Sequence, residues 1–228
     1  MSDASGATDA SMLDGWSARL AAHVAALPGD AAHDAEHVRR VVATATALAV
    51  EEGAPLEEVV PAAWLHDCVS VPKTSPDRVR ASRLAADEAV RLLAAWGYPT
   101  RWHAGIAHAI AAHSFSAGIA PRTPAARVVQ DADRLDALGA VGLARTLMLG
   151  GALGRPLYDP GDPFCARRAA DDATATVDHL YTKLLGLAAT MTTAAGRREG
   201  ERRTAFLHAF LAELARELGP ALPGEPAG

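Results

Sequence analysis

The chain has 228 residues, a net charge of −5 and a pI near 6.0, and half of its residues are hydrophobic. This length and composition suit one domain with a packed core. The acidic balance argues against binding to long nucleic acid, which needs a basic face, but it leaves room for a single anionic ligand. Aromatic residues make up only 5% and alanine is abundant, which favours packed helices over strands.

The cysteines and the N-terminus indicate a cellular compartment. Cys68 and Cys165 lie far apart in sequence, so we expect reduced thiols rather than a disulfide framework. Residues 1–11 lack the basic start and apolar run of a signal peptide. No apolar stretch approaches the roughly 18 residues needed to span a bilayer. The sequence therefore predicts a soluble, cytoplasmic protein with no membrane partner.

Hydrophobic periodicity and capping residues predict an all-α bundle of about eight helices. Residues 1–11 are expected to be a disordered leader, 12–218 a single domain, and 219–228 a disordered tail. Serine or threonine followed by proline predicts the starts of the fourth and sixth helices, Thr100 can cap the fifth, and Gly97 predicts a stop. The expected helices cover residues 12–27, 34–52, 55–66, 76–96, 100–114, 125–149, 175–193 and 199–218.

Two further features of this pattern are informative. The helix over residues 55–66 is the most uniformly apolar, so we expect it to be buried. The stretch 150–163 is rich in glycine and proline, which predicts either a functional loop or an exposed connector. Asp178 and Lys183 are interpreted as part of an exposed charged face on a late helix.

An ionisable pair stands at the end of the predicted buried helix. Placing His66 and Asp67 against an apolar core costs several kcal/mol unless something compensates them, and a divalent cation is the obvious compensation. His37 lies 29 residues before His66 on the preceding helix, and Asp133 lies 66 residues after Asp67. Helical bundles build metal sites from ligands on different helices in this way.

The surrounding motifs carry a resemblance to a known family. His37-x-x-Arg40-Val41, the apolar run into His66-Asp67, and the Ala-Asp-Arg-Leu sequence 132–135 resemble the H…HD…D signature of the HD-domain superfamily. The chain is more closely similar to a bacterial subgroup of HD hydrolases, through the Ala-His-Ser-Phe-Ser segment 112–116 and the longer aspartate motif 130–140. The similarity covers about residues 33–211.

This resemblance implies the ligands and the chemistry. It assigns one divalent metal ion (Mn, Fe, Ni, Co, Zn or Mg) to His37, His66, Asp67 and Asp133, and it favours Asp133 over Asp131 as the last ligand. It also implies that Asp67 takes part in catalysis, in which metal-bound water attacks phosphorus. No further histidine occurs between Asp67 and His103, which favours one ion over two.

Other polar residues are candidates for catalysis or for binding the substrate phosphate. The candidate catalytic residues beyond Asp67 are His113, Lys73 and Arg134. The candidate substrate-binding residues are Lys73, His113, His108, His33 and Arg155. His113 projects from the apolar face of its predicted helix, whereas His108 points away by about half a turn. Each of these residues also has a structural interpretation, as a capping, solvated or core side chain.

The sequence favours a metal-dependent phosphohydrolase that acts on a small phosphorylated metabolite, and a nucleotide is the substrate we expect first. Many HD hydrolases carry a glutamate shortly after His-Asp, but Cys68, Val69 and Ser70 stand there in this chain, so the general acid is unassigned. That departure keeps open a non-catalytic module that senses metal or nucleotide. An oxygenase with two irons is a third alternative, disfavoured by the missing histidine. Homodimer formation is left open.

Overall fold

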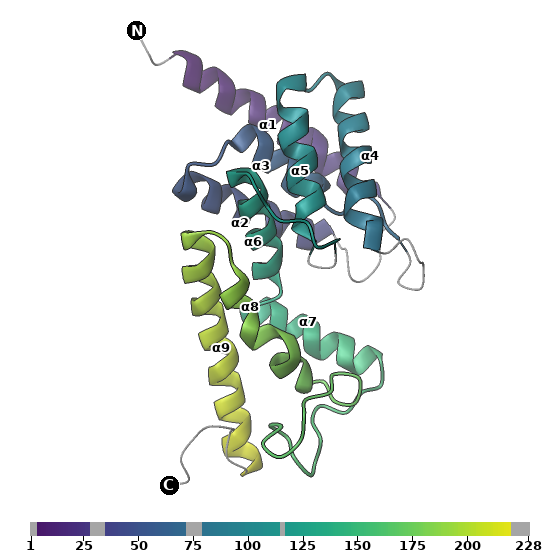
Figure 1. The fold of residues 1–228 in the computed structure, drawn as a ribbon, viewed down its shortest axis with the longest axis vertical. Helices are drawn as coiled ribbons and strands as arrows, with labels where there is room; N and C mark the ends of the chain where they lie inside the picture. Colours follow the sequence, from purple (N-terminus) through teal and green to yellow (C-terminus); the bar gives the residue numbers. More distant parts are fainter. Residues whose placement is uncertain (1–3, 28–34, 72–78, 115–116, 220–228) are drawn as a thin grey trace. The chain divides into compact units, whose positions relative to one another are not determined.

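The computed structural model describes residues 4–27, 35–71, 79–114 and 117–219, and these residues contain helices and turns but no strand (Figure 1). The predicted all-α fold is therefore confirmed. The expected disordered tail lies outside the described residues, apart from Gly219. Contacts along the chain divide it into two compact units, residues 1–133 and 134–228, with the division inside one helix.

The first unit is built around a short helix, α3, whose last seven residues are apolar. Every residue of α3 from Val59 to Leu65 is buried, as the sequence predicts, and α3 packs against α1, α2, α4 and α5. Pro61 is the sixth of the ten residues of this helix, so it lacks the backbone N–H that would otherwise bond to the carbonyl four residues earlier. The helices of this unit are α1 (Ala4–Ala25), α2 (Ala35–Glu52), α3 (Leu56–Leu65), α4 (Ala81–Trp96), α5 (His103–His113) and α6 (Pro124–Asp136).

Capping residues set several of these boundaries. Gly97 ends α4 with φ +81°, and its N–H and that of Tyr98 bond to carbonyls of the last turn. Thr123 Oγ1 accepts the N–H of Ala126 at 3.1 Å, so the predicted cap before Pro124 is confirmed. The predicted cap at Thr100 is wrong, because Thr100 begins a short 3-10 turn (η2, Thr100–Trp102) and no side chain caps α5. The Ser75-Pro76 start lies outside the described residues.

Three predicted boundaries were wrong for local physical reasons. α1 begins at Ala4, inside the expected leader, because the alanines at positions 4, 7 and 10 favour a helix. The expected helix over 125–149 is broken between α6 and α7, since Leu138 is extended and Gly139 has φ +70°. The last helix begins at Ala194, five residues early, because Thr193 Oγ1 caps it by accepting the Gly196 N–H.

The second unit consists of one long helix, α9, packed against α7 and a series of short turns. The expected regular helix over 175–193 is instead irregular, with a π-helical turn followed by one turn of α-helix and one 3-10 turn. The elements of this unit are α7 (Gly139–Ala152), η4 (Leu180–Leu184), α8 (Leu185–Leu187), η5 (Ala188–Thr190) and α9 (Ala194–Leu218).

An ion pair between Arg168 and the buried carboxylate of Asp178 organises the long segment between α7 and η4. Arg168 donates two hydrogen bonds to the Asp178 carboxylate, one of them at 2.8 Å, and the Asp171 N–H donates a third at 2.7 Å. The Asp162 carboxylate in turn accepts three backbone N–H groups, from residues 166–168. Asp178 is completely buried, so its interpretation as an exposed residue was wrong, whereas Lys183 is exposed as expected.

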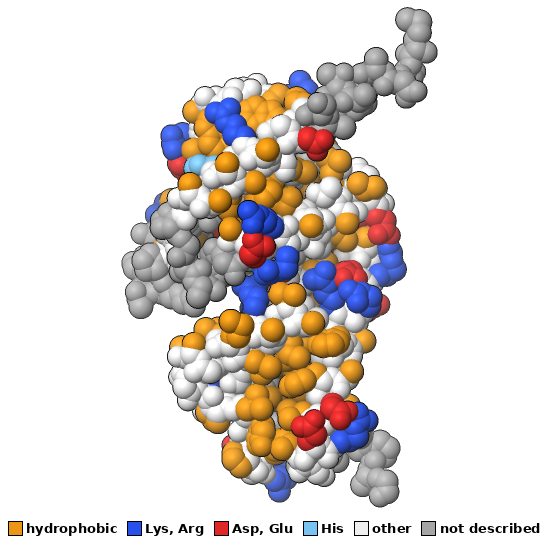
Figure 2. Space-filling model, turned by 180° about the vertical axis from the view of Figure 1, so that it is seen from behind, with side chains coloured by type: hydrophobic (Ala, Val, Ile, Leu, Met, Phe, Trp, Pro, Cys, Tyr) orange, Lys and Arg blue, Asp and Glu red, His pale blue; other side chains and the backbone are white. Residues whose placement is uncertain are grey.

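The second unit also exposes large apolar side chains. Figure 2 shows hydrophobic side chains gathered over one face of it. The exposed large apolar residues in this unit are Val141, Met148, Leu149, Leu153, Leu157 and Phe206. Among the described helices none is by itself long and apolar enough to cross a membrane, although α6 and α7 together pass that test as a pair bent by 58°.

Candidate metal centre

Five histidine and aspartate side chains converge in the first unit from four helices. α3 ends at Leu65, so His66 and Asp67 emerge where the most buried helix stops. His37 comes from the first turn of α2, His113 from the last residue of α5, and Asp133 from α6. The three histidines are buried, with 5%, 0% and 6% of His37, His66 and His113 exposed.

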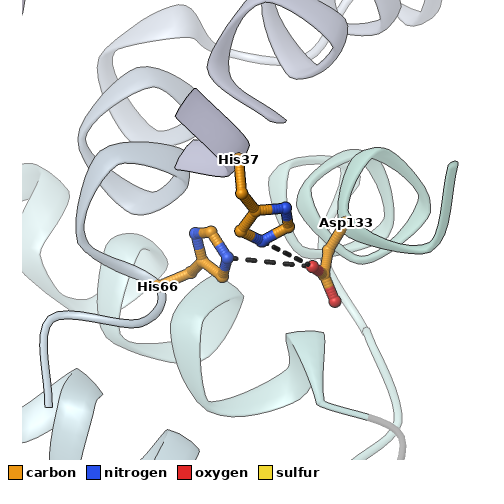
Figure 3. A group of neighbouring side chains, drawn as sticks. All are labelled: His37, His66 and Asp133. Carbon is orange, nitrogen blue, oxygen red and sulfur yellow. Dashed lines mark ion pairs between the residues drawn. The ribbon is translucent and has the colours of Figure 1, made fainter. Parts of the chain in front are cut away.

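The first group of ligands joins His37, His66 and Asp133 (Figure 3). The Nε2 atoms of His37 and His66 lie 3.5 and 3.8 Å from Oδ1 of Asp133. Each residue offers one ligand atom within 4.8 Å of the other two. Residues far apart in sequence therefore meet here, as the predicted ligand set requires.

The second group joins His66, Asp67 and His113, again with ligand atoms within 4.8 Å of one another. Asp67 lies between the two histidines: Oδ2 is 3.6 Å from Nε2 of His66, and Oδ1 is 3.6 Å from Nε2 of His113. The two imidazole rings are 5.0 Å apart between centroids, in an edge-to-face arrangement. All four predicted metal ligands thus lie in these two groups, together with His113.

Backbone hydrogen bonds orient the rings of His66 and His113. Nδ1 of His66 is 2.8 Å from the Ala63 carbonyl oxygen, and Nδ1 of His113 is 2.7 Å from that of Ile110. Because a carbonyl only accepts, each Nδ1 must carry the proton, and in the neutral ring Nε2 then presents a lone pair. Nε2 of His66 is buried and has no hydrogen-bond partner.

The donor set fits a divalent cation. An unpartnered buried nitrogen lone pair faced by two carboxylates is costly unless a cation lies among them. Imidazole nitrogens with carboxylate oxygens suit borderline divalent metals such as Mn, Fe, Co, Ni and Zn. The Nδ1-to-carbonyl bonds are the usual outer support that aims a histidine at a metal. We conclude that these residues can hold one divalent ion.

Burial and mutual charges shift the protonation of the centre. Burial lowers the pKa of His66 below its ordinary value, despite the opposing charge of Asp67. Burial alone would raise the pKa of Asp133, but the interaction with His37 and the charge of nearby His66 outweigh it and lower the pKa. For His113 burial acts downward, and the interaction with Asp67 reverses it and raises the pKa.

The remaining predicted site residues lie elsewhere or outside the described residues. His33 and Lys73 are outside them. Nε2 of His108 accepts the backbone N–H of Arg122 at 2.9 Å. In the second unit, Arg134 donates to the carbonyl oxygen and hydroxyl of Thr190, at 2.6 and 3.1 Å, and Arg155 is half-buried. The described contacts bring none of these residues into the two groups.

The residue after the His-Asp pair does not replace the missing glutamate. The Cys68 thiol donates to the carbonyl oxygen of Ala85 at 3.5 Å, so it is directed at the backbone of α4. Burial raises the pKa of Cys68 to about 12. A thiol with that pKa is neither a thiolate nucleophile nor an effective proton donor at neutral pH.

Sequence reasoning did not place His113 among the metal-facing side chains. It singled out His113 for the substrate phosphate because an imidazole on an apolar helix face needs a polar partner. The structure places its Nε2 against Asp67 instead of leaving it apart from the cluster. The only sequence signal was the position of His113 near the end of a predicted helix, in the Ala-His-Ser segment that this chain has in common with the bacterial HD hydrolases. That signal does not show which polar group His113 faces.

Comparison with known proteins defines the class. An all-α unit with histidine and aspartate ligands from separate helices is the architecture of an HD domain, and residues 34–138 match that domain. The chain is 35% identical over 196 residues to the uncharacterised protein YpgQ of Bacillus subtilis, covering 84% of this chain and 85% of that protein.

Solved structures agree with that match. An HD-superfamily hydrolase from Bacillus thuringiensis superposes with a TM-score of 0.72 and 30% identity, covering 91% of this chain and 99% of that one. B. subtilis YpgQ in complex with ADP superposes with a TM-score of 0.69 and 30% identity, covering 88% and 97%. The chain therefore belongs to the HD-domain family and, by that membership, is a metal-dependent phosphohydrolase.

Proposed function

We propose that the protein hydrolyses a small phosphorylated metabolite, with a nucleotide as the favoured substrate. The observation that carries the metal dependence is the buried, unpartnered Nε2 of His66, which two carboxylates face. A divalent ion held there would lower the pKa of a bound water molecule and neutralise charge on phosphate oxygens. Phosphoryl transfer asks the protein mainly for positioning and positive charge, and this centre supplies both.

The choice of a nucleotide rests on similarity and on charge. YpgQ, to which the chain is 35% identical, has been crystallised in complex with ADP. A net charge of −5 is unsuited to long nucleic acid but compatible with one small anion neutralised by a metal. Within the proposed site His37, His66, Asp67 and Asp133 hold the ion, and Lys73, six residues after Asp67, supplies a point charge for the phosphate.

The test is a panel of nucleotides and other phosphorylated metabolites assayed with Mn²⁺, Co²⁺, Ni²⁺ and Mg²⁺. Phosphate and pyrophosphate are measured separately, because the ratio distinguishes release of a terminal phosphate from cleavage at the α-phosphorus. Turnover should require metal and should be lost in Asp67→Ala. Absence of turnover with every metal and substrate would refute the proposed activity.

A non-catalytic nucleotide sensor is the second candidate, favoured by one observation. Cys68 occupies the region where many HD hydrolases carry a glutamate, and its high pKa removes it as a proton donor. The sensor would bind a nucleotide in a metal-dependent way without turnover. Calorimetric titration with ADP and a non-hydrolysable triphosphate, beside the turnover panel, separates the two functions.

A further inference from the structure

His113 faces the cluster in the same way as the residues already assigned to the metal. Its Nε2 is 3.6 Å from Asp67 Oδ1, and the other imidazole-to-carboxylate separations in the cluster are 3.5, 3.6 and 3.8 Å. Hydrogen bonds between these atom types span about 2.7–3.2 Å, so the His113–Asp67 separation is too long for a good one. Two atoms each about 2.1 Å from one ion are about 3.0 Å apart at a right angle and about 3.4 Å apart at a tetrahedral angle. The observed separations therefore resemble those of co-ligands.

The two groups of ligands meet at His66. Both groups contain His66, whose Nε2 faces Asp133 in one group and Asp67 in the other. A nitrogen atom has one lone pair and binds one metal ion. An ion held by His66 is therefore adjacent to both carboxylates, and His113 completes the second group.

The last turn of α5 is fixed in a way that suits a ligand. The final carbonyls of a helix have no partner within the helix, but three successive carbonyls here accept side-chain donors. Ile110 accepts from His113 Nδ1, Ala111 from Ser82 Oγ at 3.0 Å, and Ala112 from Gln130 Nε2 at 2.7 Å. The proton on Nδ1 leaves Nε2 as the metal-facing atom, and the supported turn holds the ring in place.

From these observations we infer that His113 is a fifth protein ligand of the single metal ion, with His37, His66, Asp67 and Asp133. This inference rests on the metal centre of the proposed function and extends it. Three imidazoles and two carboxylates leave one position open on a six-coordinate ion. Such a donor set favours Mn, Fe, Co or Ni over Mg, which prefers oxygen ligands, and over Zn, which prefers four-coordination.

The experiment counts coordinated histidines in protein freed of metal and reloaded with Co²⁺. In proton NMR, each histidine bound to Co²⁺ through Nε2 gives one strongly shifted, exchangeable ring N–H signal. Five ligands predict one Co²⁺ per chain and three such signals in the wild type, whereas four ligands predict two signals. This count needs no variant, so it is independent of whether a substitution unfolds the chain.

Two variants complete the test. His113→Ala should lose one of the three signals and bind Co²⁺ at least about tenfold more weakly, since even outer supports of a metal ligand affect affinity by 10–100-fold. His103→Ala is the matched control, because His103 is on the same helix but bonds to the Tyr98 carbonyl oxygen, and it should keep all three signals. Two signals in the wild type, two Co²⁺ ions per chain, or an unchanged His113→Ala spectrum would each overturn the inference. Failure of the wild type to bind Co²⁺ would instead overturn the metal centre itself, and Co²⁺ binding without turnover would overturn only the activity.

Discussion

Metal removal should destabilise the first unit as well as abolish activity. In the proposed centre Asp67 and Asp133 both face Nε2 of His66, and their side chains are only 22% and 28% exposed. Without a cation these two negative charges lie in a partly desolvated site, which disfavours the native state. An ion that binds only the native state removes that cost and stabilises it by mass action.

The magnitude follows from the linkage relation. At a free metal concentration 100 times the dissociation constant, the native state gains about 2.7 kcal/mol. For a chain of this length each kcal/mol raises the melting temperature by about 2–4 °C, so the expected rise is about 5–11 °C. At 1,000 times the dissociation constant the gain is about 4.1 kcal/mol and the rise is correspondingly larger.

The assay is thermal unfolding of chelator-treated protein at increasing Mn²⁺ or Co²⁺ concentration. Asp133→Asn is the control, since it keeps the shape of the side chain and removes the charged ligand, and its melting temperature should respond weakly to metal. A wild-type melting temperature that stays constant from zero to saturating metal would refute the interior site and favour a shallow, exposed one.

Three further predictions concern the remaining charged groups. Asp178→Asn should cost about 3 kcal/mol in urea unfolding, because it leaves the Arg168 guanidinium without its buried partner; an effect below 1 kcal/mol would contradict this. The hydrogen bond from Arg202, opposed by burial and aided by a second arginine, lowers the pKa of Glu199 to about 2. The stability that Glu199 contributes is therefore complete above its ordinary pKa near 4.5 and is lost as the pH falls towards 2, so Glu199→Gln should flatten the pH dependence of unfolding in that window. Lys73→Ala should keep its metal yet lose about ten- to a hundredfold in kcat/KM, and wild-type efficiency would exclude a phosphate contact.

Local sequence predicted much of the fold. Helices with strong signals were predicted correctly: α2 and α3 lie where periodicity places them, and α4 ends at its predicted Gly97 stop. The breaks were harder to predict, because propensity alone does not show whether a glycine interrupts a helix. Gly139, at φ +70°, ends a run that looks continuous in sequence. Likewise, no local sequence feature shows that the two units divide between Asp133 and Arg134, in the last turn of α6.

For the site, the sequence by itself singled out His66 and Asp67, because an ionisable pair directly after a buried apolar helix requires compensation wherever that helix packs. Similarity of motifs added His37 and Asp133. Only the tertiary structure decided the surroundings of His113 and Asp178. His113, the last residue of α5, faces Asp67, which follows the end of α3. The buried Asp178 accepts a hydrogen bond from Arg168, which lies in an irregular loop. Whether a polar side chain is solvated or buried against a partner depends on packing between segments distant in sequence, and local periodicity carries no information about which segments meet.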